Sequence, residues 1–295
     1  TNYQTIPLFS RKVLPLIELA PRHKTGLNLS SPVLIASGFC GYGQSYQRLI
    51  DMTVFGAVVT QPVTLRPERG TPQPRVWETT AGFVLNTGLQ NPGVRKVIQA
   101  HRKSWERLGL PVIAHLPADR PDDLTRTARA LSSVQTPQGD ALLAAIELGL
   151  PLETAPDEVE DWVAAVQAGS ELPILVKLPI GGYPALAESA VQAQADALVI
   201  GTPPLGTAYA PAYRQMVKGH LFGPALHSLV LHDIQMVAGF DLPLVAVGGI
   251  HSTADIYTFL QAGATAVQID SLLFIDPQAA YQLALDVNNT LLDSP

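Results

Sequence analysis

The sequence predicts a closed (β/α)8 barrel of the TIM type, and three observations lead to that prediction. Eight short aliphatic or β-branched segments recur along the chain, and each is followed by a longer segment with a helical pattern. Runs such as Val33-Leu34-Ile35 and Ile174-Leu175-Val176 are apolar throughout, which is typical of parallel strands buried on both faces. Strand–helix alternation repeated eight times over about 250 residues is the pattern of this barrel. An open doubly wound sheet is the alternative fold, but no Gly-x-Gly-x-x-Gly follows the first strand.

The predicted elements follow one another in the order that such a barrel requires. The eight predicted strands are residues 32–36, 56–60, 111–115, 141–147, 173–178, 195–200, 244–247 and 264–269. The predicted helices include residues 44–51, 94–108, 122–131, 157–168, 225–238 and 253–261. Asp157 and Ser252 stand where helix N-caps are expected, because their side-chain oxygens can accept hydrogen bonds from the first turn.

Two segments depart from the even spacing, although residues 1–295 as a whole are expected to form a single barrel domain. Residues 1–30 precede the first strand and contain Pro7, Pro15 and Pro21, which predicts an N-terminal arm or a plug for the barrel. Residues 61–92 form a long insertion, rich in Pro, Arg and Gly, after the second strand. A long loop at the carboxyl end of a barrel strand builds the mouth of the barrel, so the insertion is expected to cover the mouth.

The amino-acid composition argues against several classes of protein. Hydrophobic residues make up 47% of the chain and charged residues 15%, which favours a folded core over disorder. The 25 acidic and 19 basic residues give a net charge of −6, which argues against nucleic acid as a partner. The single cysteine, Cys40, excludes an internal disulfide or a Cys-rich metal site, and no metal is expected. No apolar run is long enough for a membrane span and no signal peptide is visible, so the expected location is cytoplasmic.

Four segments carry motifs beyond the barrel pattern. They are Ser-Pro-Val-Leu-Ile-Ala-Ser-Gly at residues 31–38, the Pro-rich run at 64–75, Leu-Asn-Thr-Gly-Leu-Gln-Asn-Pro-Gly at 85–93, and Val-Gly-Gly-Ile at 247–250 together with residues 263–268. Together they resemble dihydroorotate dehydrogenase, a family of FMN-dependent (β/α)8 enzymes of pyrimidine biosynthesis, along almost the whole chain after residue 26. They are similar to its first strand, its insertion, its substrate loop and its phosphate cup. The substrate loop is the most specific match. Its sequence most resembles that of the branch that pairs with an iron–sulfur flavoprotein subunit.

The resemblance implies binding residues at the predicted mouth. The substrate-binding positions would be Asn86, Thr87, Gly88, Leu89 and Asn91. The cofactor-binding positions would be Ala36, Ser37, Gln61, Lys177, Gly223, Gly248, Gly249, Asp270 and Ser271. The residues themselves are suited to this, since paired glycines let backbone N–H groups approach a phosphate and Asn amides match a planar imide or carboxylate. Barrel-corner turns for the glycines and Asx turns for the asparagines are the alternative interpretations.

The catalytic segment of the family is altered in this sequence. The family's fourth strand ends in Asn-x-Ser-Cys-Pro-Asn, whose Cys removes a proton from dihydroorotate. The matching run here is Glu-Leu-Gly-Leu-Pro-Leu at residues 147–152, and it places Leu150 at the base position. Leucine has no atom that accepts a proton, so general base catalysis at this position is impossible. Glu147 and Leu152 also replace the two amides of the segment.

Positions that contact the flavin in the family have changed as well. The lysine after the second strand is replaced by the neutral Gln61, whereas Lys177 matches the second flavin lysine. Gly201 replaces an Asn at the end of the sixth strand, and Asp270-Ser271 replaces the Gly-Thr of the phosphate cup. A carboxylate beside a phosphate is a like-charge contact that costs about 1 kcal/mol. FMN is therefore expected to be held weakly or to be absent.

Three polar residues end neighbouring predicted strands. His115, Glu147 and Lys177 close the third, fourth and fifth strands, which is the catalytic rim of a (β/α)8 barrel. They are the candidate catalytic residues, since together they can form an acid–base set or a Schiff-base site. The favoured interpretation is an ion pair between Glu147 and Lys177, with His115 as a hydrogen-bonding neighbour, in space that the flavin leaves free.

The sequence therefore predicts a dihydroorotate dehydrogenase-like protein that no longer oxidises dihydroorotate and acts as a binding or assembly protein. The resemblance implies a homodimer and allows an iron–sulfur flavoprotein as a protein partner. Two alternatives stay open. One is an active FMN-dependent oxidoreductase, and the other is a flavin-free barrel enzyme that uses Glu147 and Lys177.

Overall fold

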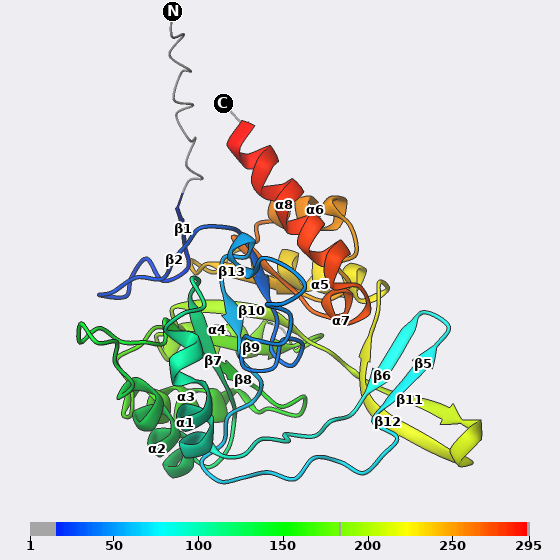
Figure 1. The fold of residues 1–295 in the computed structure, drawn as a ribbon, viewed down its shortest axis with the longest axis horizontal. Coiled ribbons are helices and arrows are strands. Elements are labelled where there is room, and N and C mark those ends of the chain that lie inside the picture. The colour runs from blue at the N-terminus through cyan, green and yellow to red at the C-terminus, as the bar shows by residue number, and fades with distance from the viewer. Residues whose placement is uncertain (1–15, 183, 294–295) are drawn as a thin grey trace, which may run out of the picture.

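A closed barrel of eight parallel strands forms the centre of the protein in a computed structural model that describes residues 16–182 and 184–293 (Figure 1). The barrel strands in chain order are β3 (Val33–Ile35), β4 (Val58–Val59), β7 (Val112–Pro117), β8 (Ala145–Gly149), β9 (Ile174–Pro179), β10 (Ala197–Thr202), β13 (Leu244–Val247) and β14 (Ala266–Ile269). Strand β14 pairs with β3 and so closes the ring. The predicted (β/α)8 class and all eight predicted barrel strands are confirmed.

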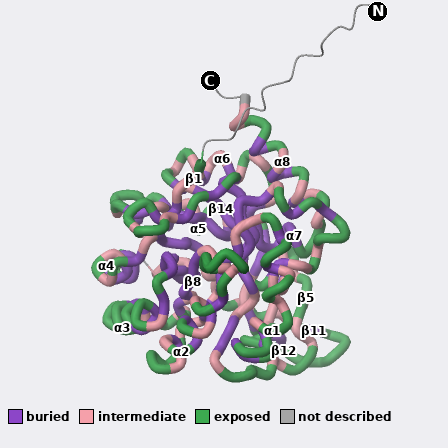
Figure 2. The backbone as a smooth tube through the Cα atoms, turned by 60° about the vertical axis from the view of Figure 1, so that its left-hand side comes forward, coloured by how far each residue is buried: buried purple, intermediate pink, exposed green. Residues whose placement is uncertain are grey.

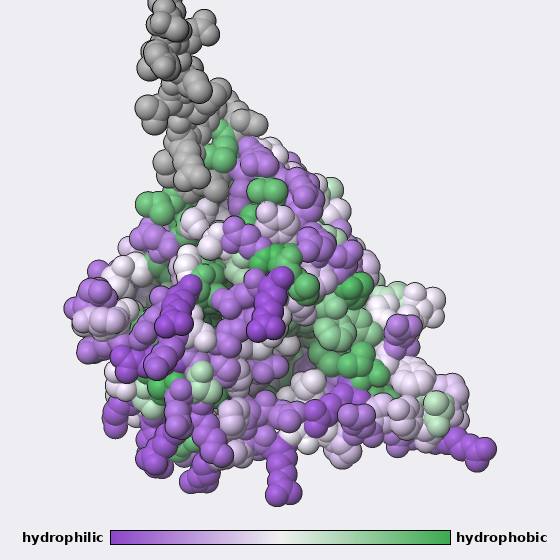
Figure 3. Space-filling model, viewed as in Figure 1, coloured by the Kyte–Doolittle hydropathy of each residue, from purple (hydrophilic) through white to green (hydrophobic). Residues whose placement is uncertain are grey.

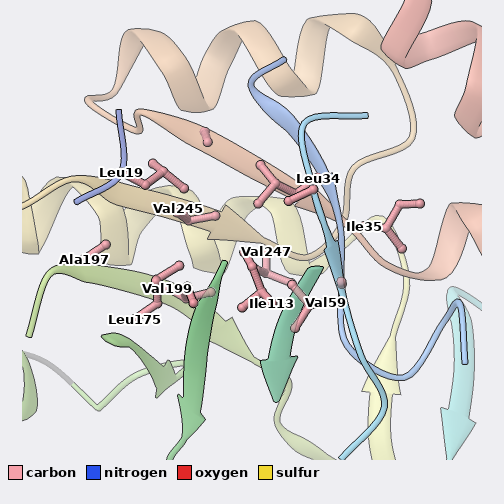
Figure 4. Close-up of a cluster of buried hydrophobic side chains, with 14 of the residues drawn as sticks. Leu19, Leu34, Ile35, Val59, Ile113, Leu175, Ala197, Val199, Val245 and Val247 are labelled. Carbon is pink, nitrogen blue, oxygen red and sulfur yellow. The ribbon is translucent and has the colours of Figure 1, made fainter. Parts of the chain in front are cut away.

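The barrel holds together through aliphatic side chains that its strands bury. Leu34, Ile113, Leu175 and Val245 are among the fully buried residues, and Figure 4 shows them converging from four strands. Burying one such side chain stabilises the fold by about 1.5–3 kcal/mol. Figure 2 shows the result, with buried strands in the middle and exposed helical surface outside. Continuous apolar runs thus become strands that are covered on both faces.

Helices cover the outside of the barrel. They are α1 (Val94–Trp105), α2 (Pro121–Ser132), α3 (Pro156–Gln167), α4 (Ala185–Gln192), α5 (Leu226–Val237), α6 (Thr253–Gln261), α7 (Ser271–Ile275) and α8 (Pro277–Asp293). Five of the six predicted helices are confirmed, with ends that differ by a few residues at most. Ser252 caps α6 as predicted, because its Oγ accepts the Asp255 N–H and the Asp255 carboxylate accepts the Ser252 N–H.

Two local predictions are wrong. Residues 44–51 form successive turns instead of a helix. Hydrogen bonds between residues three apart occur here, such as the one from Leu49 N–H to Tyr46 O at 2.8 Å. The short 3-10 helix η1 (Met52–Val54) follows them. Asp157 is not the N-cap of α3, because Pro156 already occupies the first turn and Ala155 is the cap. The Glu158 carboxylate accepts the Ala155 N–H at 2.8 Å and so replaces the expected cap bond.

A four-stranded antiparallel sheet that the sequence did not predict protrudes from the barrel (Figure 1). Its order is β11 (Leu205–Ala210), β12 (Gln215–Phe222), β6 (Gly82–Leu85) and β5 (Val76–Thr79), and η2 (Pro211–Tyr213) joins β11 to β12. Strands β5 and β6 belong to the insertion at residues 61–92, whereas β11 and β12 follow barrel strand β10. Leu85 pairs with His220, so the sheet ties the insertion to the segment after β10.

The described part of the N-terminal arm forms a small antiparallel pair, β1 (Ile17–Glu18) and β2 (Asn28–Leu29). Leu19, next to β1, is fully buried, and Figure 4 shows it beside Val245 of barrel strand β13. The Glu18 carboxylate accepts two backbone N–H groups, those of Ala20 and Leu27, and so closes the turn between the strands. Pro7 and Pro15 lie outside the described residues. Among the helices that the structure describes, none has the length and apolar character of a membrane span.

Candidate functional site at the barrel mouth

A cavity of about 580 Å³ opens at the carboxyl ends of the barrel strands. His115 from β7, Gly149 from β8 and Lys177 from β9 line it, and so does Leu89 of the insertion. A neighbouring cavity of about 910 Å³ shares part of this lining and extends beneath the 85–92 loop. The carboxyl ends of the strands and the insertion therefore enclose one continuous region, which is where ligands bind in (β/α)8 barrels.

Glu147 is the buried charge of this region. Its side chain is fully buried, and its Oε1 accepts a hydrogen bond from His115 Nδ1 at 2.8 Å. Lys177 Nζ lies 3.8 Å from the same oxygen, and Gln268 Nε2 donates to Oε2 at 2.6 Å. The structure thus brings together the three candidate residues from adjacent strands. It adds Gln268 of β14, which the sequence analysis missed although a lone amide in the apolar run Ala-Val-Gln-Ile was a visible signal.

The charges around Glu147 decide its protonation. Burial by itself raises the pKa of a carboxyl group, but Lys177 and His115 outweigh it and hold the pKa of Glu147 at about 2. The carboxylate is therefore ionised near neutral pH and can only accept hydrogen bonds. It follows that His115 Nδ1 carries the shared proton, which leaves Nε2 as the free edge of the ring.

The absence of a side chain at Gly149 leaves room for the imidazole ring of His115. A Cβ atom on Gly149 would lie 2.5 Å from Cε1 and 2.9 Å from Nε2 of His115, so any larger residue would push the ring aside. The free edge of His115 therefore lies over a glycine that itself lines the cavity.

The ion pair predicts a large effect on stability. Lys177→Met leaves the buried Glu147 carboxylate without its cationic partner and is expected to lower the free energy of unfolding by about 3–5 kcal/mol. Urea unfolding at neutral pH measures this difference. The charge-matched control is Lys96→Met at an exposed position of α1, where a change within about 0.5 kcal/mol is expected. Equal losses in the two variants would contradict a stabilising pair at the barrel mouth.

An apolar side chain stands at the residue that follows strand β8. Leu150 is 2% exposed and lines the mouth cavity, and its N–H donates to Lys177 O at 2.9 Å. Leu152 lines the same wall. This part of the wall therefore offers no group that can accept a proton.

The two glycines that follow strand β13 lie where no side chain fits. Gly248 and Gly249 have φ of 122° and 71°, and a Cβ atom on Gly249 would lie 2.2 Å from His227 N. Gly223 is similarly restricted, since its Cβ atom would lie 2.1 Å from Ala81 O. Only glycine suits these positions, whether or not a phosphate lies above them.

Asp270 follows strand β14 and precedes helix α7. Its buried carboxylate accepts the Ser271 N–H at 2.5 Å and the Ser271 hydroxyl at 2.9 Å. Burial raises the pKa of Asp270 above its usual range, and the hydrogen bonds from Ser271 offset only part of this rise. The carboxyl group thus uses the N–H and O–H groups that would otherwise be free for a phosphate.

Three further residues that the sequence predicts at the cofactor site are placed as follows. Gln61 lines the neighbouring cavity, Ala36 is buried, and Ser37 Oγ donates to Thr60 O at 2.7 Å. Gly201 has a φ of 136°, and a Cβ atom there would lie 1.8 Å from the carbonyl oxygen of Val247. This backbone therefore leaves no room for any side chain at position 201.

The amides of the 85–93 loop are engaged by the chain itself. Asn86 Nδ2 donates to Lys218 O at 2.8 Å, and its Oδ1 accepts the Gly88 N–H at 3.2 Å. Asn91 is buried, with Oδ1 accepting the Gly93 N–H and Nδ2 donating to Leu89 O. Both residues thus make Asx turns that shape the loop, and Thr87, Gly88 and Leu89 line the neighbouring cavity with them.

The Cys40 thiol and the arrangement of potential metal ligands limit the chemistry that this site can perform. Burial raises the pKa of the Cys40 thiol to about 11, so this cysteine stays protonated and is a poor nucleophile. Among residues 16–182 and 184–293, no cluster of three or more His, Cys, Asp or Glu side chains is arranged to hold a metal ion.

Comparison with known proteins shows one consistent relationship. The family model described as "Dihydroorotate dehydrogenase" matches residues 22–291. The dihydroorotate dehydrogenase B (NAD(+)) catalytic subunit of Bacillus mycoides is 32% identical over 265 residues, which cover 85% of each chain. The protein of the same name from Geobacillus kaustophilus is 31% identical over 281 residues, covering 91% of this chain and 89% of that protein. The one from Desulforudis audaxviator is 31% identical over 285 residues, or 91% of each chain.

Proposed function

The chain belongs to the dihydroorotate dehydrogenase family, and from this premise we propose that it no longer oxidises dihydroorotate and acts as a binding or assembly protein. One observation carries the proposal, and it lies on strand β8 and the residue after it. Leu150 stands at the base position as a buried apolar side chain, while Glu147 forms an ion pair with Lys177. The proton acceptor is thus missing, and the lysine that the family places beside its flavin is neutralised by a buried carboxylate.

The same residues fit FMN poorly. Gly248 and Gly249 are suited to a phosphate, but the Asp270 carboxyl group already holds the Ser271 N–H. At the ring end, Gln61 brings no charge. These features support weak binding or loss of the cofactor that the family uses.

An absorption spectrum of the purified chain tests the proposal. We expect no visible flavin bands in the protein as isolated, and no flavin in the supernatant after acid precipitation. If the chain instead carries stoichiometric flavin that dihydroorotate bleaches under anaerobic conditions, it is an active oxidoreductase and the proposal is wrong.

The surface of the protruding sheet supports a role in assembly. Leu205 is 68% exposed and Met216 is 63% exposed, and Tyr209, which pairs with Met216, is exposed on the same sheet. Figure 3 shows hydrophobic surface gathered where α7 lies beside this sheet, and Phe274 and Ile275 of α7 are about half exposed. The relatives are named catalytic subunits, which implies partner subunits for those proteins. We propose that this chain forms a homodimer, with an iron–sulfur flavoprotein subunit as its second partner.

The homodimer proposal predicts that mutations in the protruding sheet lower the molecular mass of the protein in solution. Sedimentation equilibrium is expected to give a dimer for the wild type. Tyr209→Glu with Met216→Glu is expected to weaken the association at least about tenfold, because it places two carboxylates at an apolar contact. Met236→Glu, at an exposed position of α5, is the control and should leave the mass unchanged. A monomeric wild type, or a double variant that dimerises normally, would rule out this surface.

A further inference from the structure

We propose that the chain binds a zwitterionic amino acid with an aliphatic side chain in a second cavity, of about 720 Å³, at the amino ends of the barrel strands. Ile174 begins strand β9 and Asp196 directly precedes strand β10, and both residues line this cavity. The mouth cavity opens at the carboxyl ends of the strands, which is the opposite end of the barrel. Binding at the amino end goes beyond the proposed function and is independent of flavin.

The turn between β1 and β2 gives the cavity a positively charged side. Its three consecutive residues Arg22, His23 and Lys24 all line the cavity. Arg22 forms an ion pair with Asp241, and Lys24 forms one with Glu171, both at exposed positions. Each ion pair uses a single N–H group of its cation. Both cations therefore keep further N–H groups that can donate to a carboxylate in the cavity.

The barrel gives the cavity a negatively charged side. Asp196 is half-buried and forms no ion pair among the described residues, while its Oδ2 accepts the Ile174 N–H at 2.8 Å. Burial raises the pKa of Asp196, and the Ile174 N–H and His23 offset only part of this rise. Helices α3 and α4 end at this cavity, at Gln167 and Gln192, and neither has a basic residue in its last turn. The carboxylate and the negative ends of two helix dipoles thus favour an ammonium group.

The charges of the lining favour a ligand that carries both signs. Arg22 and Lys24 balance Glu171 and Asp196, so the lining has no formal net charge when His23 is neutral. A simple anion gains at the cations and loses at the carboxylates, and a simple cation does the reverse. A zwitterion gains at both, with its carboxylate toward the turn and its ammonium toward Asp196.

Apolar side chains complete the lining and favour an aliphatic ligand. They are Leu172, Ile174, Val191 and Ala195, and all of them except Val191 are buried. No Phe, Tyr or Trp is among the described residues that line the cavity, so an aromatic ligand finds no ring to stack on. The volume lies within the range of about 300–1,000 Å³ that is usual for small-molecule sites.

Gln194 adds a polar group to the cavity at the cost of backbone strain. It follows helix α4 with a φ of 62°, a left-handed conformation in which glycine is usual. Its side chain lines the cavity and has no hydrogen-bond partner among the described residues. Residues in such strained conformations are concentrated at functional sites. A free amide that can bind a carboxylate accounts for glutamine at a position that suits glycine better.

L-Leucine is the probe that tests this chemistry. Titration calorimetry on the purified full chain is expected to show one leucine per chain. L-Leucinamide keeps the ammonium but lacks the carboxylate, and 4-methylpentanoate keeps the carboxylate but lacks the ammonium. Each analogue is expected to bind at least about tenfold more weakly than leucine, because each loses a charged hydrogen bond.

Asp196→Asn tests the location of the ligand. The variant keeps an oxygen that can accept the Ile174 N–H but removes the charge, so leucine is expected to bind at least about tenfold more weakly. Binding of 4-methylpentanoate, which has no ammonium, should not weaken. The matched control Asp161→Asn removes the same charge at an exposed position of α3 outside the cavity lining and should bind leucine like the wild type.

Gln194→Gly separates a role in binding from a role in the fold. Glycine suits the left-handed backbone better, so the urea midpoint of unfolding is expected to rise. Leucine is expected to bind about threefold more weakly or worse, because a hydrogen bond is lost. A residue that serves only the fold would not move stability and affinity in opposite directions. If Asp196→Asn does not fold, Gln194→Gly decides the question.

The outcomes separate this inference from the proposed function. Absence of leucine binding, or equal affinities for leucine and either analogue, would overturn the inference. Wild-type affinity for leucine in both Asp196→Asn and Gln194→Gly would also overturn it, because the ligand would then lie elsewhere. None of these results touches the proposed function. Stoichiometric flavin in a protein that still binds leucine at the amino end would overturn the proposed function alone.

Discussion

Dihydroorotate given to the purified chain with excess FMN is expected to be oxidised about 10²–10⁴-fold more slowly than by a relative that has the base, or more slowly still. The reason is the buried Leu150, which we propose stands at the base position and which can accept no proton. Anaerobic bleaching of the flavin absorbance measures the rate directly. The catalytic subunit of Bacillus mycoides, which is 32% identical to this chain, provides the matched comparison.

Replacing the base alone is not expected to restore the reaction. Leu150→Cys supplies a thiol, but Leu152 still lacks an amide, Gln61 is still neutral and Lys177 still lies against Glu147. We expect the rate of this variant to stay within about tenfold of the wild type, because groups that act as a unit are not additive. A wild type that reacts as fast as the relative would show that strand β8 has been aligned to the wrong segment of the family.

The barrel could be predicted from the sequence because each of its strands is recognisable from a local run of apolar residues. Runs such as Ile174-Leu175-Val176 are buried on both faces, and no distant information is needed to recognise them. The protruding sheet could not be predicted in the same way. Strand β11, Leu-Gly-Thr-Ala-Tyr-Ala, has small residues on its covered side, and β12 is completed by pairing with β6 from a distant part of the chain. Such pairings depend on tertiary context more than on local propensity.

The contacts at the barrel mouth show the same difference between what local sequence predicts and what depends on tertiary structure. His115 and Glu147 occupy paired positions on β7 and β8, so strand order alone predicts their contact. Gln268 contacts Glu147 only because the barrel closes and brings β14 within reach of β8. The use of the Ser271 N–H by Asp270 depends on a backbone conformation with φ of −109° and ψ of −96°, which no residue pattern reveals. The functional roles of the site residues, and the single domain with its arm at 1–30, stay predictions.

The second large effect is expected for FMN affinity. Asp270→Gly with Gln61→Lys should strengthen FMN binding by about 2–3 kcal/mol, or roughly 30–150-fold. The first change removes the buried carboxyl group and frees the Ser271 N–H, and the second adds a cation beside the neighbouring cavity. Quenching of flavin fluorescence on titration with protein measures the affinity. The control Gln282→Lys with Asp286→Ala makes the same change in net charge on exposed positions of α8, and less than about a twofold effect is expected.

Riboflavin, which lacks the phosphate, separates the two ends of the site. If Asp270 acts on the phosphate, Asp270→Gly should strengthen FMN binding and leave riboflavin binding unchanged. Gln61→Lys should strengthen both, because the position matches the lysine that lies beside the flavin ring in the family. A response of riboflavin to Asp270→Gly would mean that the carboxylate acts by shaping the cup and not through its charge. No response of either ligand to the double variant would mean that Glu147, by holding Lys177, is the residue that keeps the flavin out.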